Sequence, residues 1–375
     1  MFAALLVAVI ASLLVVATWV IYPLILVAIA DRRGRPPVPR AGWRPRVTVL
    51  LATREPPEAI IARVENLLAA DYPADALDIV IGLEPGPATG ATITALAALP
   101  RTRVVVGDAP GGKASNLNAA ERAATGEILV FADTYQRFDA TTITSLVEAL
   151  GDPRFGAVSG ALHLPGERTG TPSLVERYWS LERRLRWAEG AIGSSVGVTG
   201  AVYALRRTAW APLPAGLILD DLFVPMRVVL ARQRVGFLPD AIAREVRSAA
   251  ADREYGRKVR TLTGNLQLCA WLPDVLSPTR NPIWLQFVWH KLMRLATPYL
   301  LLVALAAAGI ALLLAVPHLV PALLGAALAG TVAVMWAPVA PLRRVRETVR
   351  WAFAMQAAVV TATVRGFRGQ WDVWT

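Results

Sequence analysis

The chain has 375 residues, of which 55% are hydrophobic, and it carries a formal net charge of +11 and one cysteine. This length fits one large or two ordinary domains, and the apolar content is too high for a purely soluble protein. A single cysteine excludes an intrachain disulfide framework and agrees with a reducing cytoplasmic face. The arginines cluster beside apolar segments, where anionic lipid explains them, and we therefore expect no nucleic-acid partner.

The first predicted element is a membrane helix. Residues 1–30 contain no charge and exceed the roughly 20 residues that a helix needs to cross a bilayer. A cleaved signal peptide is the alternative, but the apolar run is too long and no basic region precedes it. We expect a retained transmembrane helix over 1–30 and a basic linker over 31–45, which the positive-inside rule places in the cytoplasm.

Strands and helices then alternate. Short apolar runs typical of strands occupy residues 46–52, 77–82 and 103–106, and the helix expected between the first two covers residues 56–70. Such alternation predicts a parallel sheet with right-handed crossovers. Thr53 lies at the tip of the first strand, and Glu84 follows the second.

The most informative stretch begins with a Gly-Gly pair that permits a turn of positive φ just before Lys113. An Asn- and Ala-rich helix follows and ends near Gly126. Residues 128–131 form a continuously apolar run, as expected of a strand covered on both faces, and it leads to Asp133. Ligands of open α/β sheets bind outside the carboxyl ends of strands, so Asp133 is well placed to meet a ligand or a divalent cation. The alternative is that Asp133 only caps a turn.

A second acidic site follows a small-residue loop. Residues 157–160 and 234–239 predict further strands, and the adjacent acids Asp220 and Asp221 lie between them. A carboxylate can act as a general base if its geometry is right. Two adjacent acids are also typical of a helix N-terminus, and that position would equally fix a catalytic carboxylate.

Apolar segments return near the end of the chain. Two runs joined by a short uncharged link predict a transmembrane hairpin over 297–338. Residues 283–296 mix aromatic and basic side chains, as an interfacial helix does. Residues 343–375 hold a short apolar segment between arginines, which favours a basic interfacial or re-entrant helix and tail.

The motif GGKASNLNAA at residues 111–120, followed by a strand that ends before Asp133, resembles the donor half of glycosyltransferase family 2. The resemblance covers nearly the whole chain. It implies an α/β catalytic domain of the GT-A fold, Rossmann-like with a mostly parallel sheet, over residues 46–275, with N- and C-terminal transmembrane helices.

The resemblance also implies the donor site. Thr53 would touch the nucleotide, Glu84 would replace the usual Asp that hydrogen-bonds the uracil ring, and Lys113 would meet the diphosphate. The family's Asp-x-Asp motif is here Asp133-Thr134-Tyr135. A single carboxylate with substrate phosphates and waters can hold a divalent cation, so Asp133 is the expected ligand of Mg²⁺ or Mn²⁺.

On the acceptor side, the resemblance implies that Asp221 is the catalytic base. Asp220 replaces the family's Glu before it, and the expected Arg follows six positions after the base, at Arg227. Thr199 and Gly200 mark where the backbone can approach a sugar closely.

Two arginines occupy the place of the Gln-x-x-Arg-Trp element of membrane-bound members. Arg260 keeps the Arg, Arg257 stands where Gln is usual, and Thr261 replaces the Trp. Arginines on one helical turn can clamp a leaving diphosphate. Loss of the Trp removes a sugar-stacking platform and argues against processive synthesis.

We therefore expect a multi-pass enzyme of the cell inner (plasma) membrane with its catalytic domain in the cytoplasm. This inverting glycosyltransferase would move a sugar from a nucleotide sugar, a UDP-sugar by resemblance, to a lipid-linked or polysaccharide acceptor. One alternative is a processive polysaccharide synthase, which would need an oligomer or a secretion partner. The other is a catalytically inactive regulator that binds nucleotide sugar. The sugar, the acceptor and the linkage are left open by the sequence, because pocket shape decides them.

Overall fold

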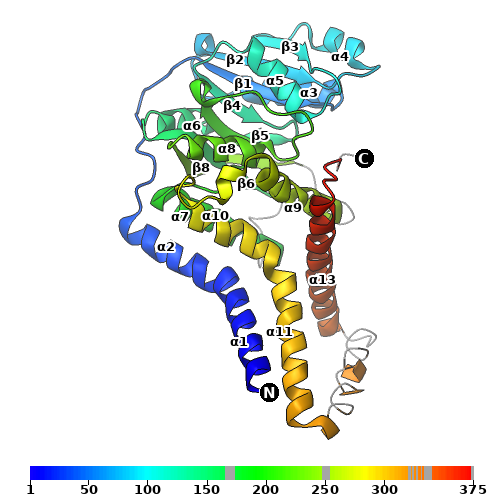
Figure 1. Cartoon of the computed structure of the whole chain (residues 1–375). Coiled ribbons are helices and arrows are strands. Elements are labelled where there is room, and N and C mark those ends of the chain that lie inside the picture. The colour runs from blue at the N-terminus through cyan, green and yellow to red at the C-terminus, as the bar shows by residue number, and fades with distance from the viewer. Residues whose placement is uncertain are drawn as a thin grey trace. The chain divides into compact units, whose positions relative to one another are not determined.

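The computed structural model describes residues 1–164, 174–246, 254–319, 322, 325–326, 328–330, 332 and 340–372 (Figure 1). The chain forms two compact units. The first comprises Met1–Leu24, Ala250–Leu266 and Val288–Gln370, and the second comprises Ile25–Ala249, Gln267–Phe287 and Trp371–Thr375. The sheet lies entirely within the second unit.

An eight-stranded sheet with the order β3-β2-β1-β4-β7-β6-β8-β5 forms the core of the second unit. The strands are β1 (Val47–Thr53), β2 (Leu77–Leu83), β3 (Thr102–Val106), β4 (Ile128–Ala132), β5 (Gln136–Phe138), β6 (Phe155–His163), β7 (Val202–Arg206) and β8 (Arg234–Glu245). Strands β1 to β4 run parallel, β7 is antiparallel to both β4 and β6, and β8 is parallel to β6. The expected α/β class with a mostly parallel sheet is confirmed.

The helices of this unit follow the strands as the alternation predicts. They are α3 (Pro57–Leu68), α4 (Thr89–Leu96), α5 (Lys113–Ala123), α6 (Thr142–Leu150), α7 (Leu174–Ile192) and α8 (Asp220–Leu230), and the second unit also holds the end of α9 (Glu254–Trp271). Central strands are apolar on both faces because helices cover them. All five residues of β4 are buried.

Two strands are longer than the sequence predicts. The expected strand over 234–239 continues to Glu245, and the strand over 157–160 extends from Phe155 to His163. The extra residues of the two strands pair with each other beyond an irregularity in register, and β8 also pairs with the three-residue β5. Such pairings join residues more than 70 positions apart, which local periodicity cannot reveal.

The N-terminal helix is present and extends beyond residue 30. Helix α1 (Phe2–Val16) continues through a π-helical turn (Ala17–Ile21) into α2 (Tyr22–Arg33). A second continuous helical run comprises α10 (Trp284–Phe287), a π-helical turn (Val288–Leu292) and α11 (Met293–Ala315). It joins the expected interfacial segment 283–296 to the first arm of the expected hairpin.

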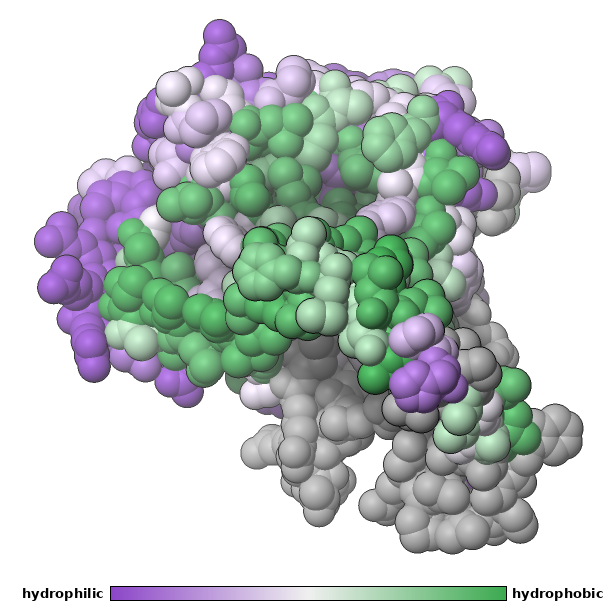
Figure 2. Space-filling model, turned by 60° about the horizontal axis from the view of Figure 1, so that its bottom comes forward, coloured by the Kyte–Doolittle hydropathy of each residue, from purple (hydrophilic) through white to green (hydrophobic). Residues whose placement is uncertain are grey.

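By length and composition, the runs Phe2–Arg33 and Trp284–Ala315 are the two helices of the described part that could cross a membrane. Within the first unit α1 packs on α11, and the Trp19 indole N–H donates to the Thr297 hydroxyl at 3.0 Å. Their outer faces expose leucine, valine and isoleucine, and Figure 2 shows apolar residues gathered on the viewed face. The second arm of the expected hairpin lies mostly outside the described residues.

The C-terminal segment that the sequence assigns to an interfacial or re-entrant element forms one helix. Helix α13 (Ala340–Phe367) has 28 residues and includes the short apolar stretch 351–364. It is not among the candidate membrane spans of the described residues. A basic helix of this kind fits a membrane surface better than a span.

Candidate active site

The candidate site lies in the second unit, where several predicted residues come together at the carboxyl ends of strands. Thr53 ends β1, Glu84 follows β2 and Asp133 follows β4. Helix α5 begins at Lys113 and helix α8 begins at Asp220. The open edge of a parallel sheet and two helix N-termini therefore meet here, an arrangement that favours anionic ligands.

Lys113 is the cation at the centre of this site. Its Nζ lies 3.2 Å from Oδ1 of Asp133 and 3.4 Å from Oδ1 of Asp220. Burial alone would lower the pKa of the Lys113 ammonium, but Asp133, Asp220 and Asp221 together raise that pKa above its ordinary value. Lys113 therefore stays charged, and three carboxylates face one ammonium.

Asp221 packs directly against the acceptor loop. A Cβ atom at Gly200 would lie 3.1 Å from Cβ and 3.3 Å from Oδ2 of Asp221, so only glycine leaves this carboxylate undisturbed. The Asp221 carbonyl accepts the Val198 N–H at 2.9 Å, which ties the loop to the start of α8. The predicted base and the predicted acceptor residues are thus adjacent.

Thr199 is fixed by both its backbone and its side chain. Its N–H donates to the Ser159 hydroxyl at 2.8 Å, and its hydroxyl accepts from Arg186 at 3.4 Å. Arg186 lies on α7 and is also paired with Glu182 at 3.3 Å. The acceptor loop is therefore held from β6 on one side and from α7 on the other.

Two buried polar atoms of the site lack a hydrogen-bond partner among the described residues. They are the Tyr203 hydroxyl and Oδ2 of Asp220, and both are buried. The Tyr203 ring stacks on Phe131 with centroids 4.1 Å apart. Burial, and then the charges of Asp220, Asp221 and Asp133, raise the pKa of Tyr203 well above its ordinary value. Tyr203 therefore stays neutral and can only share its hydroxyl proton with a neighbour.

The tips of β1 and β4 are linked by hydroxyl groups. The Thr134 hydroxyl donates to the Thr53 hydroxyl at 2.8 Å, and Thr53 also accepts the Glu55 N–H at 3.0 Å. The Tyr135 hydroxyl donates to the Glu55 carboxylate at 2.8 Å. These bonds fix the two residues that follow Asp133.

Glu84 holds the glycine turn that precedes Lys113. Its two carboxylate oxygens accept the Gly112 N–H at 2.8 and 3.0 Å, and one also accepts from the Asn116 amide at 2.8 Å. Gly111 and Gly112 have φ of +94° and +92°, the region that glycine adopts most readily. Glu84 thus supports the turn, while its contact with a nucleobase stays a prediction.

The carboxylates suit a divalent cation. Asp133, Asp220 and Asp221 gather negative charge around Lys113, and among the described residues Oδ2 of Asp220 is a buried oxygen without a hydrogen-bond partner. Among the described residues no group of three His, Cys, Asp or Glu side chains could hold a metal by itself. A cation bound by Asp133 would thus need oxygens from the substrate phosphates as well.

The structure separates the remaining predicted residues by role. Arg227 donates to the carbonyls of Ala211 and Pro212 at 3.3 Å, so it fastens the segment before α8. Arg137 donates to the Thr134 carbonyl at 2.9 Å and acts locally. Arg257 and Arg260 lie on the part of α9 that belongs to the first unit, and their contact with a diphosphate stays a prediction.

Sequence reasoning missed several residues that shape the site. Asn116 stands three positions after Lys113 in the same helix, and this helical spacing could have revealed it. Tyr203, Ser159 and Arg186 carry no local signal, because strand pairing and helix packing bring them to the site.

The model of the family described as "Glycosyltransferase like family 2" matches residues 45–264. No curated protein matches the chain. Among solved structures, the mannosyltransferase PcManGT from Pyrobaculum calidifontis, in complex with GDP-Man and Mn²⁺, is similar with a TM-score of 0.72 and 24% identity, over 96% of this chain and 99% of that one. At this identity the likeness shows the fold, and the expected GT-A fold is confirmed.

A second solved structure overlaps less. The glucosyl-3-phosphoglycerate synthase from Mycobacterium tuberculosis, in complex with phosphoglyceric acid, is 17% identical over 62% of this chain and 85% of that one. Its TM-score is 0.42, which is too low to bear on function.

Proposed function

The chain belongs to the glycosyltransferase-like family 2, and from this premise we propose that it is a membrane-bound inverting transferase. It would move a sugar from a nucleotide-sugar donor to a lipid-linked or polysaccharide acceptor. The observation that carries the proposal is the meeting of Lys113, Asp133, Asp220 and Asp221 at the open end of the sheet, with Gly200 packed on Asp221.

The donor would lie over the Gly-Gly-Lys turn. Lys113 and the N-terminus of α5 would meet the diphosphate, since both supply positive charge to an anion. Asp133 would hold Mg²⁺ or Mn²⁺ together with phosphate oxygens. The metal, when bound, supplies positive charge that stabilises the departing diphosphate.

The acceptor would approach over Thr199 and Gly200. Asp221 would take the proton of the acceptor hydroxyl as its oxygen attacks the anomeric carbon, while the bond to the nucleotide diphosphate breaks. The Asp221 side chain packs on Gly200, and its carbonyl accepts the Val198 N–H at the start of α8. These two contacts give the carboxylate a defined position. The neutral Tyr203 beneath the carboxylates adds no competing charge.

The donor base is the least constrained feature. The family resemblance favours a UDP-sugar, whereas the similar archaeal structure holds GDP-Man. Glu84 is already bonded to the turn, so a donor base would meet a carboxylate whose orientation is set by Gly112 and Asn116. We keep a UDP-sugar as the proposed donor and a GDP-sugar as its competitor.

The proposal is tested by donor binding. The purified full-length protein is titrated calorimetrically with UDP-, GDP- and TDP-sugars in the presence of Mn²⁺, and again with a chelator. One donor is expected to bind in the presence of Mn²⁺, and its affinity for Asp133→Asn is expected to be at least tenfold lower. The exposed Asp240→Asn is the matched control, and it is expected to bind as the wild type does. Binding of no nucleotide sugar, or equal binding by Asp133→Asn, would contradict the proposal.

A further inference from the structure

A cavity outside the candidate active site lies within the second unit. It has a volume of about 500 Å³, and its wall includes four arginines: Arg33, Arg35, Arg232 and Arg234. The remaining wall residues include the apolar Ile192, Pro282 and Ile283, and no Asp or Glu lines the cavity. A concave site with four cations and no acid is suited to an anion.

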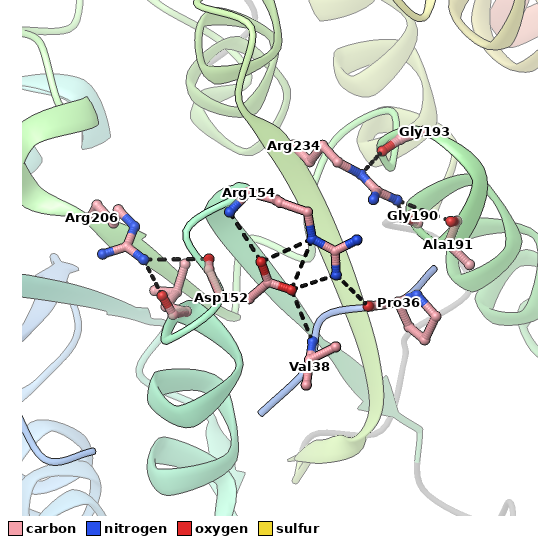
Figure 3. A network of polar contacts seen from close by, with 10 residues as sticks. Pro36, Val38, Asp152, Arg154, Gly190, Ala191, Gly193, Arg206 and Arg234 are labelled. Carbon is pink, nitrogen blue, oxygen red and sulfur yellow. Dashed lines mark hydrogen bonds and ion pairs between the residues drawn. The ribbon is translucent and has the colours of Figure 1, made fainter. Parts of the chain in front are cut away.

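Arg234 is already committed to the fold. Its guanidinium donates to the carbonyls of Gly193 at 2.6 Å, Gly190 at 2.8 Å and Ala191 at 3.0 Å, at the end of α7 (Figure 3). The Arg35 N–H also donates to the Ala191 carbonyl, at 2.7 Å. These bonds satisfy the carbonyls that end a helix, which would otherwise repel an anion at this wall.

The other arginines of the cavity keep their charge available. Among the described residues, neither Arg33 nor Arg35 forms an ion pair, and both are exposed. Arg232 donates to the Thr279 carbonyl at 3.0 Å, which leaves its charge uncompensated. Three guanidinium groups that form no ion pair among the described residues therefore line one cavity.

The local potential is positive. Burial, followed by the charges of Arg154 and Arg35, lowers the pKa of Arg234, while Asp152 opposes this. The Asp152 carboxylate is itself occupied by Arg154 at 2.6 Å and by the Val38 N–H at 3.1 Å (Figure 3). The acid whose charge acts on Arg234 is therefore already paired with another arginine.

Chain connectivity relates the cavity to the membrane surface. Arg33 is the last residue of the candidate span Phe2–Arg33, and Ile283 directly precedes the candidate span Trp284–Ala315. A residue at the end of a span lies at the level of the lipid headgroups. The wall of the cavity thus includes the last residue of one candidate span and the residue directly before the other.

We propose that this cavity binds the phosphate group of an anionic phospholipid headgroup. Guanidinium groups recognise phosphate through paired N–H donors, and basic pockets beside membrane helices suit anionic headgroups. The site is separate from the glycosyl-transfer chemistry, although the lipid source rests on the proposed membrane spans. A free phosphate has the same chemistry, and the experiment distinguishes the two sources.

The test measures the thermal unfolding midpoint of the full-length protein in neutral detergent. Short-chain phosphatidylglycerol, short-chain phosphatidylcholine and inorganic phosphate are titrated separately. The variant Arg33→Gln/Arg35→Gln removes two side chains that make no ion pair in the described part. The matched control Arg103→Gln/Arg122→Gln removes the same charge from exposed positions elsewhere.

Phosphatidylglycerol is expected to raise the midpoint of the wild type and the control, whereas phosphatidylcholine is not. In Arg33→Gln/Arg35→Gln the half-saturating concentration of phosphatidylglycerol should rise at least tenfold. It should also rise in Arg232→Gln, which changes a residue of a different segment. An equal effect of inorganic phosphate would overturn the lipid assignment in favour of a soluble phosphate. An equal response of the wild type and both cavity variants would overturn the site.

Discussion

Gly200 lies so close to Asp221 that replacing this glycine by alanine tests whether the position of the carboxylate matters. Alanine at position 200 would place Cβ 3.1 Å from Asp221 Cβ, and the carboxylate must shift to relieve the contact. The shift needed is a few tenths of an ångström. We expect Gly200→Ala to lower kcat by up to about tenfold, because rate depends on the exact placement of the catalytic group. Donor binding should be unchanged.

The control for this substitution is Gly90→Ala in α4, where a Cβ atom meets nothing within 4 Å. Gly90 lies in the first turn of α4, so alanine there is expected to raise the free energy of unfolding by at most about 1 kcal/mol and to leave kcat unchanged. Unfolding curves give the stability of both variants, and initial rates give their kcat. Equal rates for Gly200→Ala and Gly90→Ala would contradict the inference that Gly200 positions the Asp221 carboxylate.

Lys113 sets the charge balance of the carboxylates. Replacing Lys113 by Met removes the ammonium whose charge interacts favourably with the ionised carboxylates of Asp133, Asp220 and Asp221. Since the base acts when deprotonated, the acidic limb of the kcat/KM profile should move to higher pH. The charge-retaining Lys113→Arg should keep that limb near the wild-type pH. If the acidic limb of the Lys113→Met profile stayed at the wild-type pH, Lys113 would not act on the catalytic carboxylate.

Which site residues could be predicted depends on how local their signal is. Lys113, Asp133 and Asp221 stand at strand ends or helix starts that the chain itself marks, and the structure brings the first two into an ion pair. Tyr203 looks like an ordinary strand residue in the sequence. Only the pairing of β7 with β4 places it on Phe131 and under the carboxylates.

The Gly-Gly-Lys turn is the element that places the lysine, and Glu84 is its anchor. Glu84→Ala would leave the Gly112 N–H and the Asn116 amide without their acceptor. We expect a loss of about 1–3 kcal/mol in the free energy of unfolding, together with a higher KM for the donor. Denaturant unfolding and steady-state kinetics measure the two effects.

The control for the turn is Glu65→Ala on the exposed face of α3, which should change stability by less than about 0.5 kcal/mol. If Glu84→Ala were as stable as Glu65→Ala, the carboxylate would not hold the turn. A higher KM without a loss of stability would assign Glu84 to nucleotide contact, as the family resemblance implies.

The strands were predictable to different extents for a physical reason. Strands β1, β2 and β4 are buried on both faces, so each is an apolar run that the sequence displays. Strand β5 has only the three residues Gln136–Phe138, and its pairing with β8 depends on contacts more than 100 positions away. Periodicity carries no information about such an element.

In its described residues the protein combines the sheet unit with two helices of membrane-spanning length. Spans of this length and hydropathy insert stably, whereas surface charge alone is screened by salt. We expect the protein to stay in the membrane pellet after washes at high salt and at alkaline pH, and to be released only by detergent. Fractionation with an antibody to the chain checks this. Release by salt would assign the protein to the membrane surface through its basic residues.

The measurement that tests the central claim most directly is nucleotide release by the full-length protein reconstituted in a cellular lipid extract, which supplies the acceptor. UDP- and GDP-sugars are supplied with Mg²⁺ or Mn²⁺, and the wild type is compared with Asp221→Asn and with Asp240→Asn. One donor should turn over in the wild type and in Asp240→Asn, and a chelator should stop it. In Asp221→Asn the rate should fall by about 10²–10⁴ while donor binding persists. Turnover by Asp221→Asn at the wild-type rate, or no release from any donor by the wild type, would contradict the account.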